Sequence, residues 1–169
     1  MKNSNKYEKR EYENLRRGIK MLIKITNRHI WTLFYIAFII FIFSNSMQVA
    51  TESARQSADV LHYLQEFLGT GWLTDHIVRK AAHFSEFALL GILGVQCMRQ
   101  YTGRCMLPAL FTGLLTTLTD ETIQLFVEGR SGQVSDVWID FAGCCCGAVA
   151  LKVVLHFLWQ LQGRRKNGD

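Results

Sequence analysis

Four long apolar blocks dominate this sequence, and they restrict the folds that the chain can adopt. The first block, residues 30–43, reads IWTLFYIAFIIFIF and continues through the uncharged residues 44–50. Together these approach the roughly 20 apolar residues that a membrane-spanning helix needs. The other blocks cover about residues 81–98, 105–126 and 137–159. The sequence therefore predicts an integral membrane protein with four spans.

The spans are predicted to be helices. The chain has one proline, and turn dipeptides such as Asn-Gly are scarce, whereas a membrane β-barrel needs alternating strands and frequent turn signals. The predicted fold class is all-α, an integral membrane four-helix bundle. A short interfacial helix is also expected in the first outer loop, because apolar residues recur there at helical spacing, at Val60, Leu61, Leu64, Phe67 and Leu68.

Positive charge is concentrated near the two ends of the chain. Nine of the 19 Lys and Arg residues precede residue 29, and Arg164, Arg165 and Lys166 lie near the other end. Because cytoplasmic loops of membrane proteins are rich in Lys and Arg, we expect both termini to be cytoplasmic. The net charge of +5 is then explained by a multi-pass protein of the cell membrane, with the lipid bilayer as partner and no nucleic acid.

This topology divides the chain into three parts. Residues 1–28 form a basic cytoplasmic amphipathic arm, which we expect to lie along the inner membrane surface. Residues 29–160 form the four-span membrane domain, and residues 161–169 form a basic cytoplasmic tail. The segments 51–80 and 127–136 then face outward. The five cysteines lie in or beside apolar blocks without metal-ligand spacing, so we interpret them as packing residues.

Ionisable residues recur at helical spacing where the second span begins. Arg79, His83 and Glu86 occupy positions i, i+4 and i+7, which lie on one face of a helix. A simpler explanation fits part of this group, because Arg79 and Lys80 could serve as anchors at the membrane interface. That explanation does not extend to His83 and Glu86, which lie deeper in the span.

The third and fourth spans carry similar polar residues at their ends. The third ends with Asp120, Glu121 and Gln124, and the fourth begins with Asp136 and Asp140. Asp136 also fits the N-cap of the fourth helix. The charge asymmetry independently assigns all these ends to the outer side. Ionisable groups inside a membrane helix are costly and are normally paired, turned inward and functional. The sequence therefore predicts one polar site near the outer face.

We assign two kinds of role to the residues of this site. Acid–base roles go to His83, Glu86, Glu121 and Asp140. Substrate-binding roles go to Arg79, Asp120, Gln124, Arg130 and Asp136. A histidine with carboxylates could bind a divalent metal, although two nearby arginines oppose a cation. Alternatively, a carboxylate and His83 could transfer protons while the arginines hold a phosphate, such as that of a lipid-linked molecule. The arginines favour the second possibility, and the sequence leaves a metal or cofactor undetermined.

These residues resemble the motifs of the VanZ-like family, small bacterial membrane proteins whose founding member is associated with low-level resistance to the glycopeptide teicoplanin. The resemblance covers about residues 43–147. It rests on several elements in this order: Arg79-Lys80-x-x-His83-Phe84-x-Glu86, Asp120-Glu121-x-x-Gln124-x-Phe126, Gly129-Arg130, Asp136-Val137, and the glycines Gly143 and Gly147. Ser44 also resembles a serine that the family has after its first span.

This sequence departs from the family pattern at three positions. Phe87 stands where a tyrosine is usual, Glu128 where proline is frequent, and Asp140 where asparagine is common. Asp140 adds a negative charge to the predicted site. The resemblance implies a cell-membrane protein with a link to glycopeptide susceptibility. Together with the position of the polar residues, it leads us to expect a protein that acts on or binds a phosphate-bearing lipid or envelope precursor. The alternative is a non-enzymatic accessory that alters envelope or surface properties, so whether the protein is an enzyme stays open.

The predicted topology can be tested by cysteine-accessibility labelling of intact cells. Cysteines introduced at residues 129–133 should react with an impermeant reagent added outside, because the loop between the last two spans faces outward. Cysteines introduced from Arg164 onward should not react. The reverse pattern would contradict both the topology and the outward-facing site.

Overall fold

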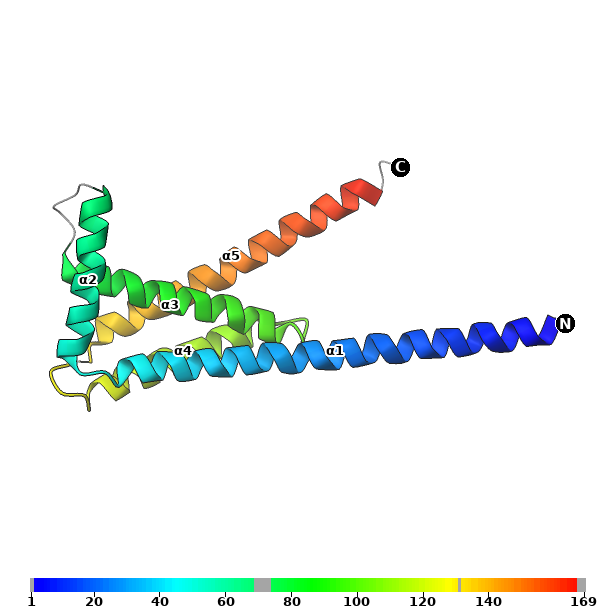
Figure 1. Cartoon of the computed structure of the whole chain (residues 1–169), viewed down its shortest axis with the longest axis horizontal. Helices are drawn as coiled ribbons and strands as arrows, with labels where there is room; N and C mark the ends of the chain where they lie inside the picture. Colours follow the sequence, from blue (N-terminus) through cyan, green and yellow to red (C-terminus); the bar gives the residue numbers. More distant parts are fainter. Residues whose placement is uncertain (1, 69–73, 131, 167–169) are drawn as a thin grey trace.

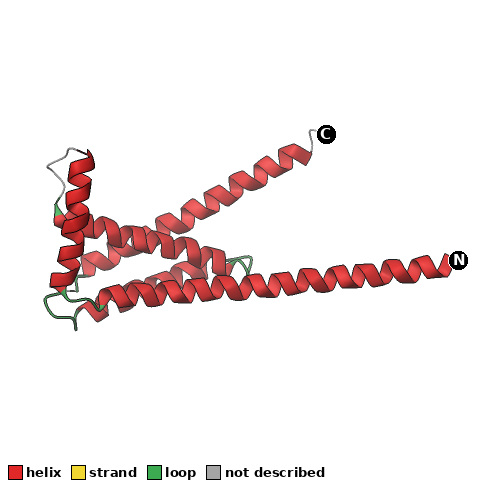
Figure 2. Cartoon of the chain, viewed as in Figure 1, coloured by secondary structure: helices red, strands yellow, loops and turns green. Residues whose placement is uncertain are grey.

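The chain is entirely helical over the residues that the structure describes. In this computed structural model those residues are 2–68, 74–130 and 132–166. They form five helices: α1 (Lys2–Ser46), α2 (Ala50–Leu68), α3 (Asp75–Met98), α4 (Met106–Gln124) and α5 (Val134–Lys166). The described residues contain no strand (Figure 2). The predicted all-α class is confirmed.

Four of the helices form the bundle, and α2 lies across one end of it (Figure 1). α3 packs against α5, α4 and α1, and α4 also contacts α5 and α1. Among the described residues the backbones of α1 and α5 do not come close to each other, so the two helices lie on opposite sides of the α3–α4 pair. The N-terminal part of α1 and the C-terminal part of α5 extend away from the end opposite α2 (Figure 1).

Three of the described helices are long and apolar enough to cross a membrane. The qualifying segments are Tyr12–Ser46 of α1, Asp75–Met98 of α3 and Val134–Gly163 of α5. α4 does not meet this criterion, because several threonines and the acidic pair near its C-terminal end reduce its mean hydropathy. It nevertheless packs against all three of the others and completes the predicted four-helix bundle.

The closest helix pair, α3 and α5, depends on glycines. A Cβ atom at Gly143 would overlap the backbone carbonyl of Phe84, and a Cβ atom at Gly147 would overlap that of Ala88. Backbone atoms cannot move aside as a flexible side chain can. The two glycines, one turn apart, therefore let the helices approach closely, as small residues do in membrane bundles.

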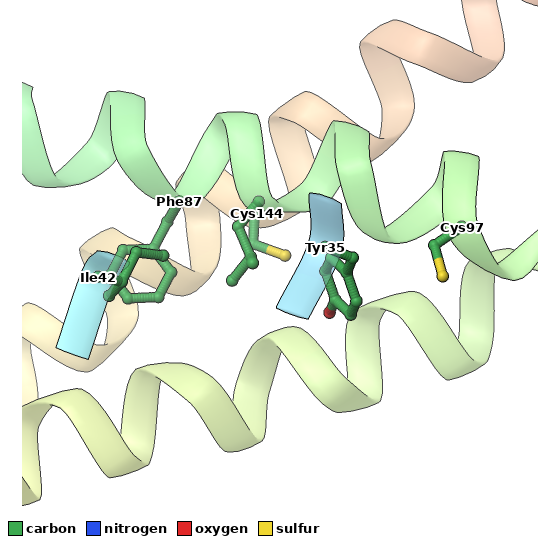
Figure 3. Packing of buried hydrophobic residues seen from close by; sticks show 6 residues of the cluster. Tyr35, Ile42, Phe87, Cys97 and Cys144 are labelled. Carbon is green, nitrogen blue, oxygen red and sulfur yellow. The ribbon is translucent and has the colours of Figure 1, made fainter. Parts of the chain in front are cut away.

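Below the α2 end, apolar side chains from the four bundle helices meet in the core. Tyr35 and Ile42 of α1, Phe87 of α3 and Cys144 of α5 are buried and pack together (Figure 3). The Tyr35 hydroxyl also hydrogen-bonds to Thr112 Oγ1 of α4, at 2.8 Å, which ties α1 to α4. All five cysteines are free, as predicted, and three of them are buried.

α1 differs from the predicted division of the N-terminal region. It is one helix of 45 residues, without a break between the basic arm and the apolar span. The arm therefore continues straight from the span (Figure 1), because residues 18–30 contain no proline and only one glycine, so nothing ends the helix there. Our expectation that the arm lies along the inner membrane surface stays a prediction.

The polar segment after the first span was also predicted imperfectly. The span was expected to reach Ala50, but α1 ends at Ser46, and α2 already begins at Ala50. α2 has 19 residues, whereas only its apolar second half was predicted as helix. Its first turns are polar but compatible with a helix, and the side chains of Glu52 and Arg55 pair there at 3.0 Å.

The remaining boundaries move outward for α3 and α5. α3 begins at Asp75, because the Thr74 side chain caps it by accepting a hydrogen bond from the Ile77 N–H. α5 extends from Val134 to Lys166, beyond the predicted residues 137–159. Of the predicted tail, residues 167–169 lie outside the described residues, as do residues 69–73 after the interfacial helix.

The α3–α5 contact predicts opposite effects for two glycine substitutions in α5. Gly147→Ala should lower the free energy of unfolding by about 1–3 kcal/mol, because the new methyl group overlaps the Ala88 carbonyl. Gly163→Ala should be neutral or slightly stabilising, since nothing lies within 4 Å of its Cβ position and alanine favours helix. Unfolding of purified protein in detergent measures both, and equal effects would contradict the close approach.

Candidate functional site

A polar cavity lies at the end of the bundle next to α2. Its volume is about 200 Å³. The loop between α4 and α5 and the ends of four helices contribute its lining, which includes Ala50, His76, Arg79, Lys80, His83, Glu121, Gln124, Gly129, Arg130, Gln133, Asp136, Ile139 and Asp140. Most of these side chains are charged or can hydrogen-bond, so the cavity suits a polar or charged ligand.

The carboxylate of Asp120 is completely buried beside this cavity. It accepts hydrogen bonds from Ser46 Oγ at the end of α1 and from Gln124 Nε2, one turn further along α4, the latter at 3.0 Å. A buried carboxylate is costly without such donors. These bonds therefore hold the Asp120 side chain in one orientation and connect α1 to α4.

The neighbouring carboxylate, Glu121, holds the α4–α5 loop. Its Oε2 atom accepts a hydrogen bond of 2.9 Å from the backbone N–H of Gln133. The same loop contacts α2, because the Ala50 N–H donates to the Glu128 carbonyl at 3.3 Å. Gly129, which follows Glu128 in this loop, has a φ of 74°, a conformation that only glycine adopts readily. The loop is thereby placed so that Arg130 reaches the cavity.

Three basic side chains line the cavity, and their ionic partners differ. Lys80 Nζ lies 2.5 Å from a carboxylate oxygen of Asp136, which joins α3 to α5. Arg79 has a looser partner, with 3.9 Å between its guanidinium and the carboxylate of Asp75.

Arg130 is the third of these basic groups. It forms no salt bridge with another described residue, and its hydrogen bond to the Asn45 carbonyl is long, at 3.5 Å. Burial lowers the pKa of the Arg130 guanidinium, and the nearby carboxylate of Asp120 acts in the opposite direction. An arginine stays charged despite such a shift. Arg130 is therefore a partly desolvated cation that could accept an anion.

A second cavity, of about 280 Å³, lies between α2 and α3. Glu86 lines it and accepts a hydrogen bond of 2.6 Å from Asn45 Nδ2. Arg79, His83 and Arg130 line both cavities and so form the wall between them. A ligand in either cavity would meet the same three side chains.

His83, Asp120 and Asp140 form the tightest group of potential ligands for a metal. One ligand atom of each lies within 4.8 Å of the other two. The Asp140 side chain is 1% exposed, and its Oδ2 atom has no hydrogen-bond partner among the described residues. The same holds for the buried Nδ1 atom of His83. This group could hold a metal ion or pass a proton between histidine and carboxylate.

All nine predicted site residues lie at the α2 end of the bundle. Seven of them line the first cavity: Arg79, His83, Glu121, Gln124, Arg130, Asp136 and Asp140. Asp120 lies beside this cavity through its group with His83 and Asp140, and Glu86 lines the second cavity instead. The structure brings these residues together, and the acid–base and substrate-binding roles assigned to them stay predictions.

The residues that sequence reasoning missed include Asn45, Ser46 and Gln133, which hydrogen-bond to acidic residues of the site, and His76, which lines the first cavity. A signal existed for Ser46, because it shares a helix face with the buried Tyr35 and Ile42, at i+11 and i+4 from them. Ser44, which the family resemblance singled out, is exposed and donates to the Ile40 carbonyl of its own helix. It lies outside the site.

Comparison with known proteins identifies the family. The family model described as VanZ/LLP1 matches residues 30–156, which is most of the chain. The chain belongs to the VanZ/LLP1 family. Together with the apolar helices, this makes it a membrane protein of the VanZ-like family. All nine predicted site residues fall within the VanZ/LLP1 match, and the basic arm precedes it. Neither the curated proteins nor the solved structures yielded a match.

The hydrogen bond to Asp120 predicts different effects for two serine substitutions in α1 of this VanZ-family protein. Ser46→Ala should lower the free energy of unfolding by about 1.5–3 kcal/mol, because a buried carboxylate loses a donor. Ser44→Ala should change it by less than about 0.5 kcal/mol, since Ser44 is exposed. Unfolding in detergent measures both. Similar values for the two variants would show that the Ser46–Asp120 bond contributes little.

Proposed function

We propose that this protein binds, and acts on, a phosphate-bearing lipid or cell-envelope precursor at the outer face of the cell membrane. The observation that carries the proposal is the pair of arginines in the wall between the two cavities. Arg130 has no salt bridge among the described residues, and the partner of Arg79 is 3.9 Å away. Guanidinium groups bind phosphate through two parallel hydrogen bonds, so two of them can hold one phosphate group.

The size of the first cavity supports a headgroup as the ligand. At about 200 Å³ it is smaller than the roughly 300–1,000 Å³ of pockets that enclose a drug-sized molecule. A phosphate group with its first substituent is therefore a better match than a whole lipid. Acyl or polyprenyl chains would remain outside, in the bilayer.

The exposed face of α2 supports a position at the membrane interface. Val60, Tyr63 and Phe67 are spaced along one side of this helix and are 49%, 72% and 85% exposed. Exposed apolar residues on an amphipathic helix favour the boundary between lipid and water. Val60 also lines the second cavity, so this cavity adjoins the face that we place in lipid.

The neighbouring acidic groups and His83 suggest what the site could do to a bound phosphate ester. His83 lines the first cavity with the arginines and is grouped with the buried Asp140, and a histidine next to a carboxylate can donate or accept a proton at neutral pH. We assign His83 the proton transfer to or from the ester oxygen, with Asp140, Glu121 and Glu86 as its acid–base partners. The arginines would compensate the negative charge of the phosphate.

We also propose that the two termini are cytoplasmic, which places the site at the outer leaflet. Glycopeptides act on envelope precursors on that side of the membrane. This position, together with the family's association with teicoplanin resistance, motivates the proposal that the site influences glycopeptide susceptibility.

Binding of a phosphate-bearing lipid tests the proposal directly. Purified protein in detergent should bind short-chain phosphatidic acid and not the diacylglycerol with the same chains, which lacks the phosphate. Arg130→Ala should weaken binding about 10- to 100-fold, the effect of losing about 1.5–3 kcal/mol of charged hydrogen bonding. Arg104→Ala is the matched control, because Arg104 is exposed at the opposite end of the bundle. Equal binding of both lipids would refute phosphate recognition.

The same variants can be compared in cells that express the protein. His83→Ala, Glu86→Gln and Arg130→Ala should abolish any protection against teicoplanin while the amount of membrane-inserted protein is unchanged. Arg104→Ala should protect as well as the parent. Protection by all variants alike would favour the non-enzymatic accessory.

A further inference from the structure

The site contains more buried acidic groups than its cations can neutralise. Six carboxylates belong to the site or pair with its basic side chains, and two of them already face a cation, since Asp136 pairs with Lys80 and Asp75 lies near Arg79. The other four are Glu86, Asp120, Glu121 and Asp140. Arg130 is the one remaining basic side chain among the residues that line the two cavities, histidines aside.

Hydrogen bonds satisfy three of these four carboxylates. Glu86 accepts from Asn45, Asp120 from Ser46 and Gln124, and Glu121 from the backbone of Gln133. The fourth, Asp140, differs. It is 99% buried, Oδ2 has no partner among the described residues, and its carboxylate belongs to the group with His83 and Asp120. Since buried polar atoms are almost always satisfied, an unpartnered carboxylate oxygen needs an explanation, and a bound ion would provide one.

We propose that His83, Asp120 and Asp140 bind a divalent transition-metal ion between α3, α4 and α5. One ligand atom of each residue lies within 4.8 Å of the others, so a single ion can contact all three after small side-chain adjustments. Zinc, for example, lies about 2.0–2.2 Å from its nitrogen and oxygen ligands. The two oxygens of Asp120 each accept one hydrogen bond but keep further lone pairs for a metal.

The types of ligand indicate the class of ion. Magnesium and calcium prefer oxygen ligands alone, whereas a ring nitrogen with two carboxylates is typical of zinc, manganese or iron. Ser46 and Gln124 would orient the Asp120 carboxylate from behind, as second-layer hydrogen bonds do in established metal sites. Three protein ligands also leave a coordination position for a water molecule or a substrate oxygen.

The basic side chains near the group do not exclude this ion. The carboxylates of Asp75 and Asp136 already compensate Arg79 and Lys80 in part. The charged groups that act on Asp140 include four other carboxylates: Asp120, Glu121, Asp136 and Glu86. A cation beside Asp140 would therefore relieve repulsion among acids. The inference does not depend on the proposed lipid ligand, because it concerns only this charge balance and the unpartnered atoms. A bound ion would occupy His83 and Asp140, and proton transfer would then fall to Glu121 and Glu86.

Direct metal analysis of the full-length protein tests the inference. Protein purified in detergent is freed of metal with a chelator and then dialysed against Zn²⁺ and, separately, Mn²⁺, and the bound ion is measured by mass spectrometry. We expect about one equivalent per chain of at least one ion, and a higher melting temperature in its presence, because an ion that binds the folded state stabilises it. No bound ion and no thermal shift for the parent would overturn the inference.

Substitutions then locate the ion. Asp140→Asn keeps the size of the side chain and should weaken binding at least tenfold, and His83→Asn should do the same. Asp59→Asn is the control, since it makes the same change of side chain at an exposed position of α2 outside the ligand group, and it should retain the ion. Parent-like affinity in Asp140→Asn and His83→Asn would overturn the assignment of these ligands.

Measuring the binding of phosphatidic acid to the same proteins in the presence of a chelator separates this inference from the proposed function. Metal binding without phosphatidic acid binding would remove the proposed function and leave the metal site. Phosphatidic acid binding by a parent protein that binds neither ion would remove the metal site alone.

Discussion

The close approach of α3 and α5 determines where the charged residues of the site meet. The glycine contacts set the register, because Gly143 lies on the Phe84 carbonyl and Gly147 on that of Ala88. His83 immediately precedes Phe84, and Asp140 is one turn before Gly143, so this register places the two side chains together. One turn further toward α2, the same register brings Lys80 to Asp136. A shift of one turn would separate both pairs.

Much of this arrangement could be predicted from the sequence, for reasons that are local. Hydropathy marks a span wherever apolar residues are continuous, and helical spacing places Arg79, His83 and Glu86 on one side of α3. The cost of charge in lipid then implies that polar ends of several spans share one location. These arguments require no knowledge of which helices are neighbours, and they identified nine residues that the structure places at one end of the bundle.

The remainder depends on tertiary contacts, which spacing along one helix does not contain. Ser46 becomes part of the site only because α1 packs against α4 and brings its hydroxyl to Asp120. Gln133 contributes through its backbone, which any residue other than proline could do. The apolar block of α4 was predicted as a span, but α4 is not among the three described helices that are apolar enough to cross a membrane, because the acidic pair that belongs to the site lowers its hydropathy.

The continuous α1 helix has a mechanical consequence. At 1.5 Å per residue its 45 residues span about 68 Å, roughly twice the 30 Å hydrocarbon layer. The helix that carries the basic arm therefore ends, without a break, in Asn45 and Ser46, the donors to Glu86 and Asp120. Because the arm and these donors belong to one continuous helix, a rotation of the arm about the helix axis would also move the groups that hold the two carboxylates.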